Sequence, residues 1–279
     1  MLHYISCPPP DPSASEGTIL LIHGFPQTSY QFRRVITPLS DAGYHVLAPD
    51  YRGAGESSKP RDGYTKDILA RDLHRLITDH EGIKDPVHLV GHDIGGMIAH
   101  AYAVLYPSHT ASVIWGECPL PGTQVYHEAK YTMAMWHFTF HSVPDLPELL
   151  VAGREKIYLK HFFDRLAQNP SAISTHDLEV YATAFAQPGA MRAGMDLYRA
   201  FEADGEMNVR WLEEKGKCGV RCLNLWGGKS FADEEMAMKM AEGFYESVRF
   251  GTVEGAGHWI AEERPREFVE MVLAWVQQG

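Results

Sequence analysis

The stretch VHLVGHDIGG, residues 87–96, decides how this chain folds. Its first part, Val87–Val90, is an apolar run that predicts a buried strand, and the residues after it carry the apolar pattern of a helix. Gly91 and Gly95 flank Asp93 between the two elements, and glycines at these positions allow a tight strand-to-helix turn. Such a turn exposes its middle side chain, so the pattern predicts Asp93 as a nucleophile. A glycine-rich turn in which Asp93 only caps the helix is the alternative.

The same alternation of strands and helices extends outward from this turn. Segments with apolar residues at helical spacing include Tyr30–Leu39 and Ile68–Ile77, and Arg264–Gln277 predicts an amphipathic closing helix. Continuous apolar strands that alternate with helices predict the α/β class, with a mostly parallel sheet covered by helices on both faces. Five further apolar runs predict strands: Thr18–Ile22, Tyr44–Ala48, Ala111–Trp115, Val220–Trp226 and Val248–Val253.

The strand pattern disappears between about residues 119 and 205, where the sequence is helical and rich in aromatic residues and Met. We therefore expect a core of residues 1–118 and 206–279 with a helical cap, residues 119–205, inserted between two strands. In parallel sheets, ligands bind at the carboxyl ends of the strands, so the cap is expected to cover a site there. Its apolar residues predict a small hydrophobic substrate. Phe162 and Phe163 are expected to pack the cap against the core.

Composition excludes several classes of function. The 279 residues include 25 Lys and Arg against 36 Asp and Glu, for a net charge of −11, which disfavours nucleic acid and anionic membrane surfaces as partners. Four cysteines are too few for a disulfide scaffold, and no metal-ligand pattern or phosphate-binding loop is present, so we expect no metal and no cofactor. The first residues resemble no secretion signal, and no apolar run is long enough to span a membrane. We expect a cytoplasmic enzyme, monomeric or homodimeric.

Two loops at predicted strand ends contain further candidate catalytic groups. His23-Gly24-Phe25-Pro26 follows an early strand, and the backbone N–H of Phe25 can form an oxyanion hole with that of Ile94. Gly255-Ala256-Gly257-His258 follows the last strand and predicts His258 as a catalytic base. A nucleophile that precedes its histidine in this way has the chain order of α/β-hydrolases.

Four motifs together resemble the α/β-hydrolase superfamily: HGFP at 23–26, DYRGAGES at 50–57, GHDIGG at 91–96 and GAGH at 255–258. The resemblance covers nearly the whole chain and is closest to the branch of epoxide hydrolases and of haloalkane and haloacetate dehalogenases. It implies an α/β-hydrolase fold with a cap, in which Asp93 is the nucleophile and His258 the base.

A carboxylate nucleophile restricts the reaction. Attack by Asp93 on an acyl carbon would form an unstable mixed anhydride, whereas attack on an sp³ carbon with a good leaving group forms an ordinary alkyl ester. Water activated by His258 can then hydrolyse that ester at the carbonyl of Asp93. Esterase and protease activities are therefore disfavoured, and the leaving group is expected to be an epoxide oxygen or a halide.

The resemblance favours the epoxide over the halide. Haloalkane dehalogenases use side chains at the positions of Phe25 and Ile94 to donate hydrogen bonds to the halide, but neither of these residues has a side-chain donor. Fluoroacetate dehalogenases place arginines after the nucleophile, where this chain has Ile94 and Met97. Epoxide hydrolases use cap tyrosines to protonate the ring oxygen. The segment from Met195 to Ala200 resembles one such motif and makes Tyr198 the expected acid.

A second cap motif is ambiguous. The segment Met135-Trp136-His137-Phe138 resembles the other tyrosine motif of epoxide hydrolases, with His137 in place of the tyrosine. The Trp136-His137 pair also resembles the halide pocket of fluoroacetate dehalogenases. We expect Trp136, His137 and Phe138 to contact the substrate. A dehalogenase, or a hydrolase fold repurposed for ligand binding or a non-hydrolytic biosynthetic step, remains an alternative.

The acid that orients His258 has two candidates. Most epoxide hydrolases place it after the penultimate strand, where this chain has Ser230, with Asp233 three residues later. The dehalogenase branch offers a position after the strand that follows the nucleophile helix, and there Glu117 follows Ser112–Trp115. We expect Glu117 to be this acid, with Asp233 as the alternative.

Overall fold

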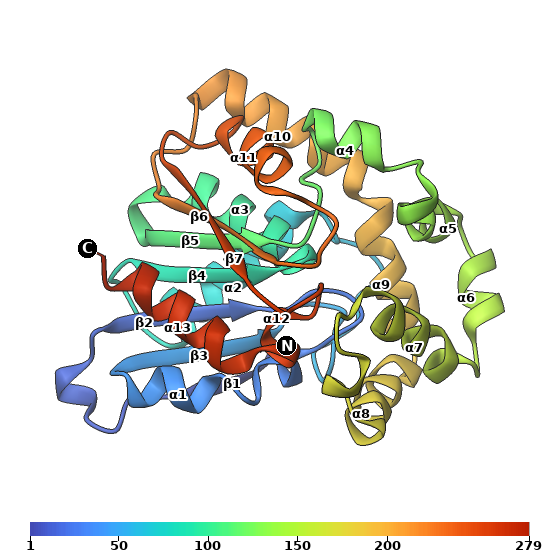
Figure 1. Cartoon of the computed structure of the whole chain (residues 1–279), viewed down its shortest axis with the longest axis horizontal. Coiled ribbons are helices and arrows are strands. Elements are labelled where there is room, and N and C mark those ends of the chain that lie inside the picture. The colour runs from blue at the N-terminus through green and yellow to red at the C-terminus, as the bar shows by residue number, and fades with distance from the viewer. Residues whose placement is uncertain (279) are drawn as a thin grey trace.

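One seven-stranded sheet in the order β1-β3-β2-β4-β5-β6-β7 organises the computed structural model, which describes residues 1–278 (Figure 1). All neighbouring strands are parallel except β1, which pairs antiparallel with β3 at the edge. The predicted α/β-hydrolase fold with a mostly parallel sheet is confirmed. The strands are β1 His3–Cys7, β2 Gly17–Ile22, β3 Tyr44–Asp50, β4 Val87–His92, β5 Thr110–Gly116, β6 Cys222–Gly227 and β7 Val248–Val253.

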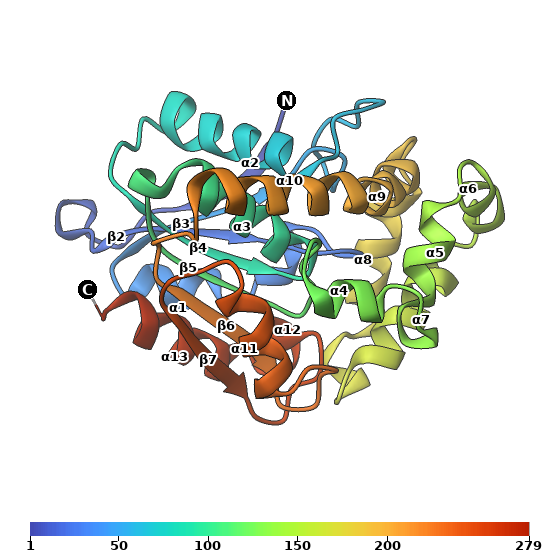
Figure 2. The same ribbon diagram turned by 90° about the horizontal axis from the view of Figure 1, so that it is seen from above.

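Helices cover both faces of the sheet, as the alternation along β2 demonstrates. Leu20 and Ile22 of this strand belong to one buried cluster, and Ile19 and Leu21 belong to another. Because side chains of a strand point alternately to opposite faces, an entirely apolar strand must be covered twice. Figure 2 shows the helices on the two sides. The first cluster includes residues of α2 (Lys66–Arg75), α3 (Ile94–Leu105) and α11 (Glu234–Glu242), and the second includes residues of α1 (Ile36–Asp41), α12 (Ile260–Glu263) and α13 (Pro265–Val276).

Two local predictions are wrong. The edge strand β1 was not expected, because its five residues mix polar and apolar side chains and bury little surface. The predicted helix Tyr30–Leu39 is instead a 3₁₀ turn, Ser29–Phe32, followed by α1. Pro38 explains the break, because proline has no N–H to donate and is tolerated only in the first turn of a helix.

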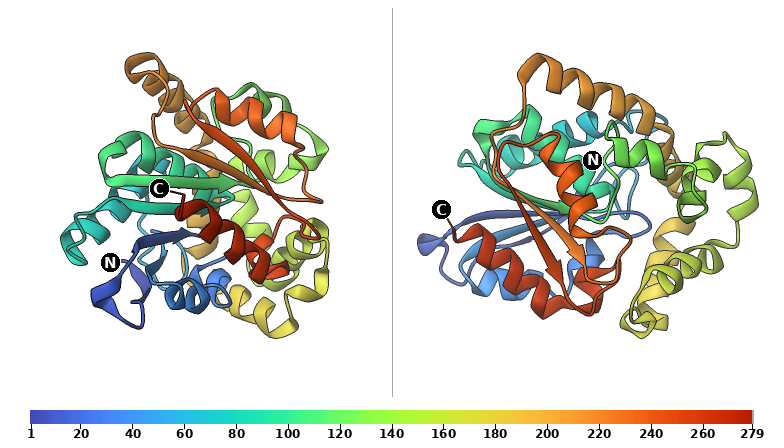
Figure 3. Two further views of the ribbon diagram at one scale, coloured as in Figure 1. Left: turned by 60° about the vertical axis from the view of Figure 1, so that its left-hand side comes forward. Right: turned by 45° about the horizontal axis from the view of Figure 1, so that its top comes forward.

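The helices between β5 and β6 lie beyond the carboxyl ends of the strands, at one end of the molecule (Figures 1 and 3). They are α4 Gln124–Ala129, α5 Trp136–Ser142, α6 Leu146–Val151, α7 Glu155–Leu166, α8 Thr175–Ala186 and α9 Ala190–Arg199. Helix α10, Phe201–Lys215, leads from them back to the core. Within residues 1–278, no helix combines the length and apolar character needed to cross a membrane.

Candidate active site

Asp93 occupies a strained turn between β4 and α3. Its backbone has φ 54° and ψ −127°, a conformation that non-glycine residues rarely adopt. The flanking glycines are required by close approach: a Cβ on Gly91 would lie 2.3 Å from the backbone oxygen of Gly95, and one on Gly95 would lie 2.1 Å from that of Ile22. Backbone strain that the surrounding structure maintains is typical of functional sites. The local geometry therefore matches the predicted nucleophile turn.

Glu117, His258 and Asp93 form a continuous chain of polar groups at the strand ends. The Nδ1 atom of His258 lies 2.9 Å from Oε2 of Glu117, and its Nε2 atom lies 3.9 Å from Oδ2 of Asp93. Glu117 directly follows β5 and is buried. The gap on the Asp93 side is longer than a hydrogen bond, as expected where a reacting group must enter.

The structure brings Glu117, not Asp233, to His258. Oε1 of Glu117 accepts a hydrogen bond of 2.7 Å from the Gly227 N–H, and Oε2 accepts one of 2.5 Å from the Ser230 hydroxyl. Ser230 thus occupies the position where an acid was first sought and orients Glu117 instead. Asp233 caps α11 by accepting from the N–H of Met236.

Replacing Glu117 by Gln should slow hydrolysis of the Asp93 ester strongly. The imidazole of His258 would lose the charge that fixes its tautomer and stabilises its protonated form, and in a serine-protease triad this costs about 10⁴-fold. Asp233→Asn should have little effect on this step, because the carboxylate of Asp233 caps α11 and does not contact His258. Single-turnover kinetics of both variants decide the assignment: a hydrolysis defect in Asp233→Asn but not in Glu117→Gln contradicts it.

Backbone N–H groups surround the Asp93 carboxylate. The N–H of Phe25 donates to Oδ1 at 3.0 Å, and the N–H of Ile94 also hydrogen-bonds the carboxylate. Burial raises the pKa of Asp93, and the nearby His258 and these two N–H groups partly offset that effect. Donors in this position can stabilise an oxyanion that forms at the Asp93 carbonyl.

The loop that carries His258 is held from two sides. The backbone N–H of His258 donates to the carbonyl of Leu166 at 2.9 Å. The backbone carbonyl of His258 lies 2.7 Å from Nε2 of His92, the residue before Asp93. Burial alone would lower the pKa of His258, but the hydrogen bond and charge of Glu117, together with the charge of Asp93, raise the pKa above its ordinary value. The contacts of His258 thus fix its ring beside both Asp93 and Glu117.

Two polar side chains from the helices between β5 and β6, Tyr198 and His137, lie near Asp93. Both line the cavity that contains Asp93 and His258, and their ring centroids are 5.6 Å apart. Burial and the charge of Asp93 raise the pKa of Tyr198 well above its ordinary value, while burial lowers the pKa of His137 to about 3. At neutral pH the phenol of Tyr198 is therefore protonated and the imidazole of His137 is neutral. Phe138 also lines the cavity, as expected.

The predicted substrate contact of Trp136 is not found. Its ring packs on Phe162 with a centroid distance of 5.9 Å, and it is absent from the residues that line the cavity. The reason is helical geometry: Trp136 begins α5, so its side chain points about 100° away from that of His137. A halide pocket built from both residues is therefore not assembled around Asp93.

The residues in or against the cavity that were not assigned there from the sequence include His141, Phe162, Arg165 and Phe231. His141 lies one helical turn after His137, with its ring centroid 4.3 Å from that of Tyr198, and its spacing was the available signal. Phe162, expected only to join cap and core, also lines the cavity, whereas Phe163 packs on Trp259. No sequence pattern marks Arg165 or Phe231, because their positions depend on how the cap is placed.

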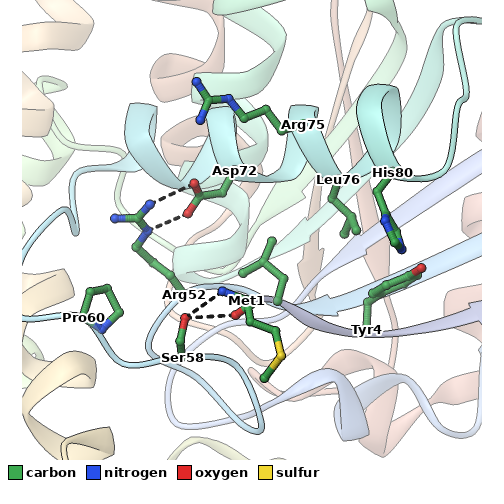
Figure 4. A pocket seen from close by; sticks show the side chains of 10 residues that line it. Met1, Tyr4, Arg52, Ser58, Pro60, Asp72, Arg75, Leu76 and His80 are labelled. Carbon is green, nitrogen blue, oxygen red and sulfur yellow. Dashed lines mark hydrogen bonds and ion pairs between the residues drawn. The ribbon is translucent and has the colours of Figure 1, made fainter.

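The cavity over Asp93 is small, at about 100 Å³. A larger surface pocket of about 560 Å³ shares none of its lining residues and is crossed by the ion pair between Arg52 and Asp72 (Figure 4). That pocket holds no Asp-His-Glu arrangement, so its size does not make it the site. Among residues 1–278, no group of three or more His, Cys, Asp and Glu side chains is arranged to hold a metal ion.

Comparisons with known proteins agree with this arrangement. The family model described as alpha/beta hydrolase fold matches residues 17–265. The soluble epoxide hydrolase of Corynebacterium sp. (strain C12) is 29% identical over 98% of this chain and 92% of its own length. The AB hydrolase superfamily protein YfhM of Bacillus subtilis (strain 168) is 31% identical, over 93% and 90% respectively. The crystal structure of wild-type Cfl2 from Burkholderia cenocepacia matches with a TM-score of 0.91 and 32% identity, over 99% of this chain and 92% of that one.

Proposed function

This chain belongs to the α/β hydrolase fold family, as a hydrolase of its epoxide hydrolase-like branch, and we propose that it opens an epoxide to a vicinal diol through an ester on Asp93. One observation carries the proposal: the Asp93 carboxylate lines the same cavity as the Tyr198 phenol and the His137 imidazole. A nucleophile opposite two hydrogen-bond donors is what an epoxide requires, because its carbon is attacked while its oxygen must be protonated.

In the first step, Asp93 attacks an epoxide carbon. Oδ1 already accepts the N–H of Phe25, which leaves Oδ2, on the side of His258, to form the new C–O bond. The carbon–oxygen bond of the ring breaks, its electron pair goes to the ring oxygen, and that oxygen takes a proton from Tyr198, assisted by a hydrogen bond from His137. The product is a hydroxyalkyl ester of Asp93.

In the second step, water hydrolyses this ester. Nε2 of His258 takes a proton from water, and the hydroxide adds to the carbonyl carbon of Asp93. The negative charge develops on Oδ1, where the N–H groups of Phe25 and Ile94 stabilise it. Collapse breaks the bond to the alkyl oxygen, which takes the proton from His258 as the diol leaves. The regenerated Asp93 carboxyl group releases its proton to solvent, and a solvent proton restores the Tyr198 phenol.

Shape and donor chemistry support an epoxide over a halide. Neither Phe25 nor Ile94 offers a side-chain donor, and Trp136 is not among the residues that line the cavity. The volume of about 100 Å³ lies below the 300–1,000 Å³ typical of sites for drug-sized ligands. With walls of Phe25, Phe138 and Phe162, it favours a compact, apolar epoxide.

Tyr198→Phe should slow formation of the Asp93 ester by about 10²–10⁴-fold, the usual contribution of a general acid. Hydrolysis of the ester should be spared, because the phenol acts only on the ring oxygen. His137→Gln should cause a smaller loss in the same step, since it assists without donating the proton. Rapid-quench measurement of both steps tests this, and an equal slowing of both by Tyr198→Phe contradicts the role.

The function itself is tested with matched panels of compact epoxides and haloalkanes or haloacetates. We expect diols from the epoxides, detected by mass spectrometry, and no halide release from the second panel. Halide release without diol formation would favour the dehalogenase alternative. Binding of epoxides without turnover would favour the repurposed fold.

A further inference from the structure

We propose that Lys66, in the core, is a positioning residue that holds Tyr198 over Asp93 by fixing the junction between α9 and α10. The proposal rests on the function proposed above. Lys66 is 3% exposed and is not among the residues that line the cavity, so it cannot touch the substrate. Its contacts lead to Tyr198 by two separate routes.

The first route runs through the backbone. Nζ of Lys66 donates a 2.6 Å hydrogen bond to the carbonyl of Leu197, the residue directly before Tyr198. The second runs through packing: Nζ lies 4.5 Å from the ring centroid of Phe201, which is itself 4.9 Å from that of Tyr198. Lys66 thus contacts the chain on both sides of the tyrosine, where α9 ends and α10 begins.

Asp204, in the first turn of α10, completes the arrangement. Its Oδ2 lies 2.7 Å from Nζ of Lys66, and its Oδ1 accepts the Lys66 backbone N–H at 2.8 Å. Both side chains are buried, and a buried ion pair adds little net stability relative to apolar residues of similar volume. Directional contacts that place one element against another are a better physical reason for this pair than stability.

Tyr198 needs such support because its own hydroxyl is not anchored. Across residues 1–278, that hydroxyl makes no hydrogen bond to protein, which leaves it free for the ring oxygen. Its placement must therefore come from its backbone and from ring packing. A displacement of about 1 Å at a reacting group can cost 10²-fold in rate. Loosening the α9–α10 junction should accordingly affect ring opening and leave ester hydrolysis unchanged.

The test is a double variant, Lys66→Met with Asp204→Asn, which removes both charges and keeps an acceptor for the backbone N–H of residue 66. In the His258→Gln background, where the ester accumulates, we expect its formation to slow by about 10–100-fold. With His258 present, ester hydrolysis should keep its rate. When Tyr198→Phe is added, the effect of the double variant should vanish, because no hydroxyl remains to be misplaced.

A second ion pair at the boundary between cap and core, between the partly buried Arg33 and the buried Glu262, provides the control. Arg33 lies 2.8 Å from Glu262, which also accepts the hydroxyl of Tyr181 in α8, away from the α9–α10 junction. Arg33→Met with Glu262→Gln should lower the thermal midpoint without a loss of ester formation that depends on Tyr198.

Three results would overturn the proposal: slowing that persists in Tyr198→Phe, equal slowing of both steps, or the same Tyr198-dependent loss in the control pair. If the Lys66 double variant does not fold, Asp204→Asn alone is compared in the same backgrounds. It weakens the ion pair that holds Lys66 but leaves the amine donating to Leu197, so it should slow ester formation less than the double variant and only where Tyr198 is present. No slowing, or the same slowing in the Tyr198 and Tyr198→Phe backgrounds, overturns the proposal. Failure of the wild type to open any epoxide refutes the underlying function instead.

Discussion

Asp93→Asn should abolish epoxide turnover, with a loss on the order of 10⁶-fold, as when the nucleophile of another covalent hydrolase is removed. An amide oxygen is a far poorer nucleophile than a carboxylate, so no ester would form. The fold should persist, because Asn tolerates the positive φ of this position at least as well as Asp. Steady-state diol formation and the mass of the intact protein after incubation with epoxide measure both effects.

The control for this variant is chemical. Asn at an active site can deamidate to Asp and restore activity, so peptide mass spectrometry must establish that residue 93 is still Asn when turnover is measured. Asp93→Ala, which cannot revert in this way, should be equally inactive. Substantial diol formation by verified Asn or Ala variants would exclude covalent catalysis by Asp93.

His258→Gln should form the ester and fail to hydrolyse it. Only the second step needs a base, and glutamine cannot accept a proton from water at neutral pH. We expect a burst of about one equivalent of epoxide consumed, with a stable adduct on the peptide that carries Asp93. Steady-state turnover at the wild-type rate, with no adduct, would remove His258 from the mechanism.

Most of the fold is predictable because the central strands are buried and therefore consist mainly of apolar residues. Strands β2 to β6 were each indicated by an apolar run, since a strand covered on both faces cannot contain many polar residues. The edge strand β7 was also predicted, although it is only partly buried. The edge strand β1 has neighbours on one side only, and its mixed composition carried no such signal. The break before α1 depended on Pro38, whose effect overrides the apolar spacing around it.

The residues of the candidate site also differ in how well the sequence predicts their positions. Asp93, Glu117 and His258 follow the ends of strands, and because parallel strands end at one edge, their proximity could be expected from the sequence. Their chemical roles stay predictions. The cap is less predictable, because the rotation of each helix decides which side chains reach the cavity. Trp136 was therefore misplaced, the one-turn spacing between His137 and His141 was not used, and the position of Arg165 could not be expected from the sequence.

The most direct measurement follows the oxygen atom of Asp93 itself. Wild-type enzyme in excess over a compact epoxide, in water labelled with oxygen-18, completes a single turnover, and both the diol and the peptide that carries Asp93 are weighed. We expect an unlabelled diol and a labelled Asp93 carboxylate, because the nucleophile passes its own oxygen to the product and replaces it from water. A labelled diol with unlabelled Asp93 would mean that water attacks the epoxide directly, and would contradict the ester mechanism.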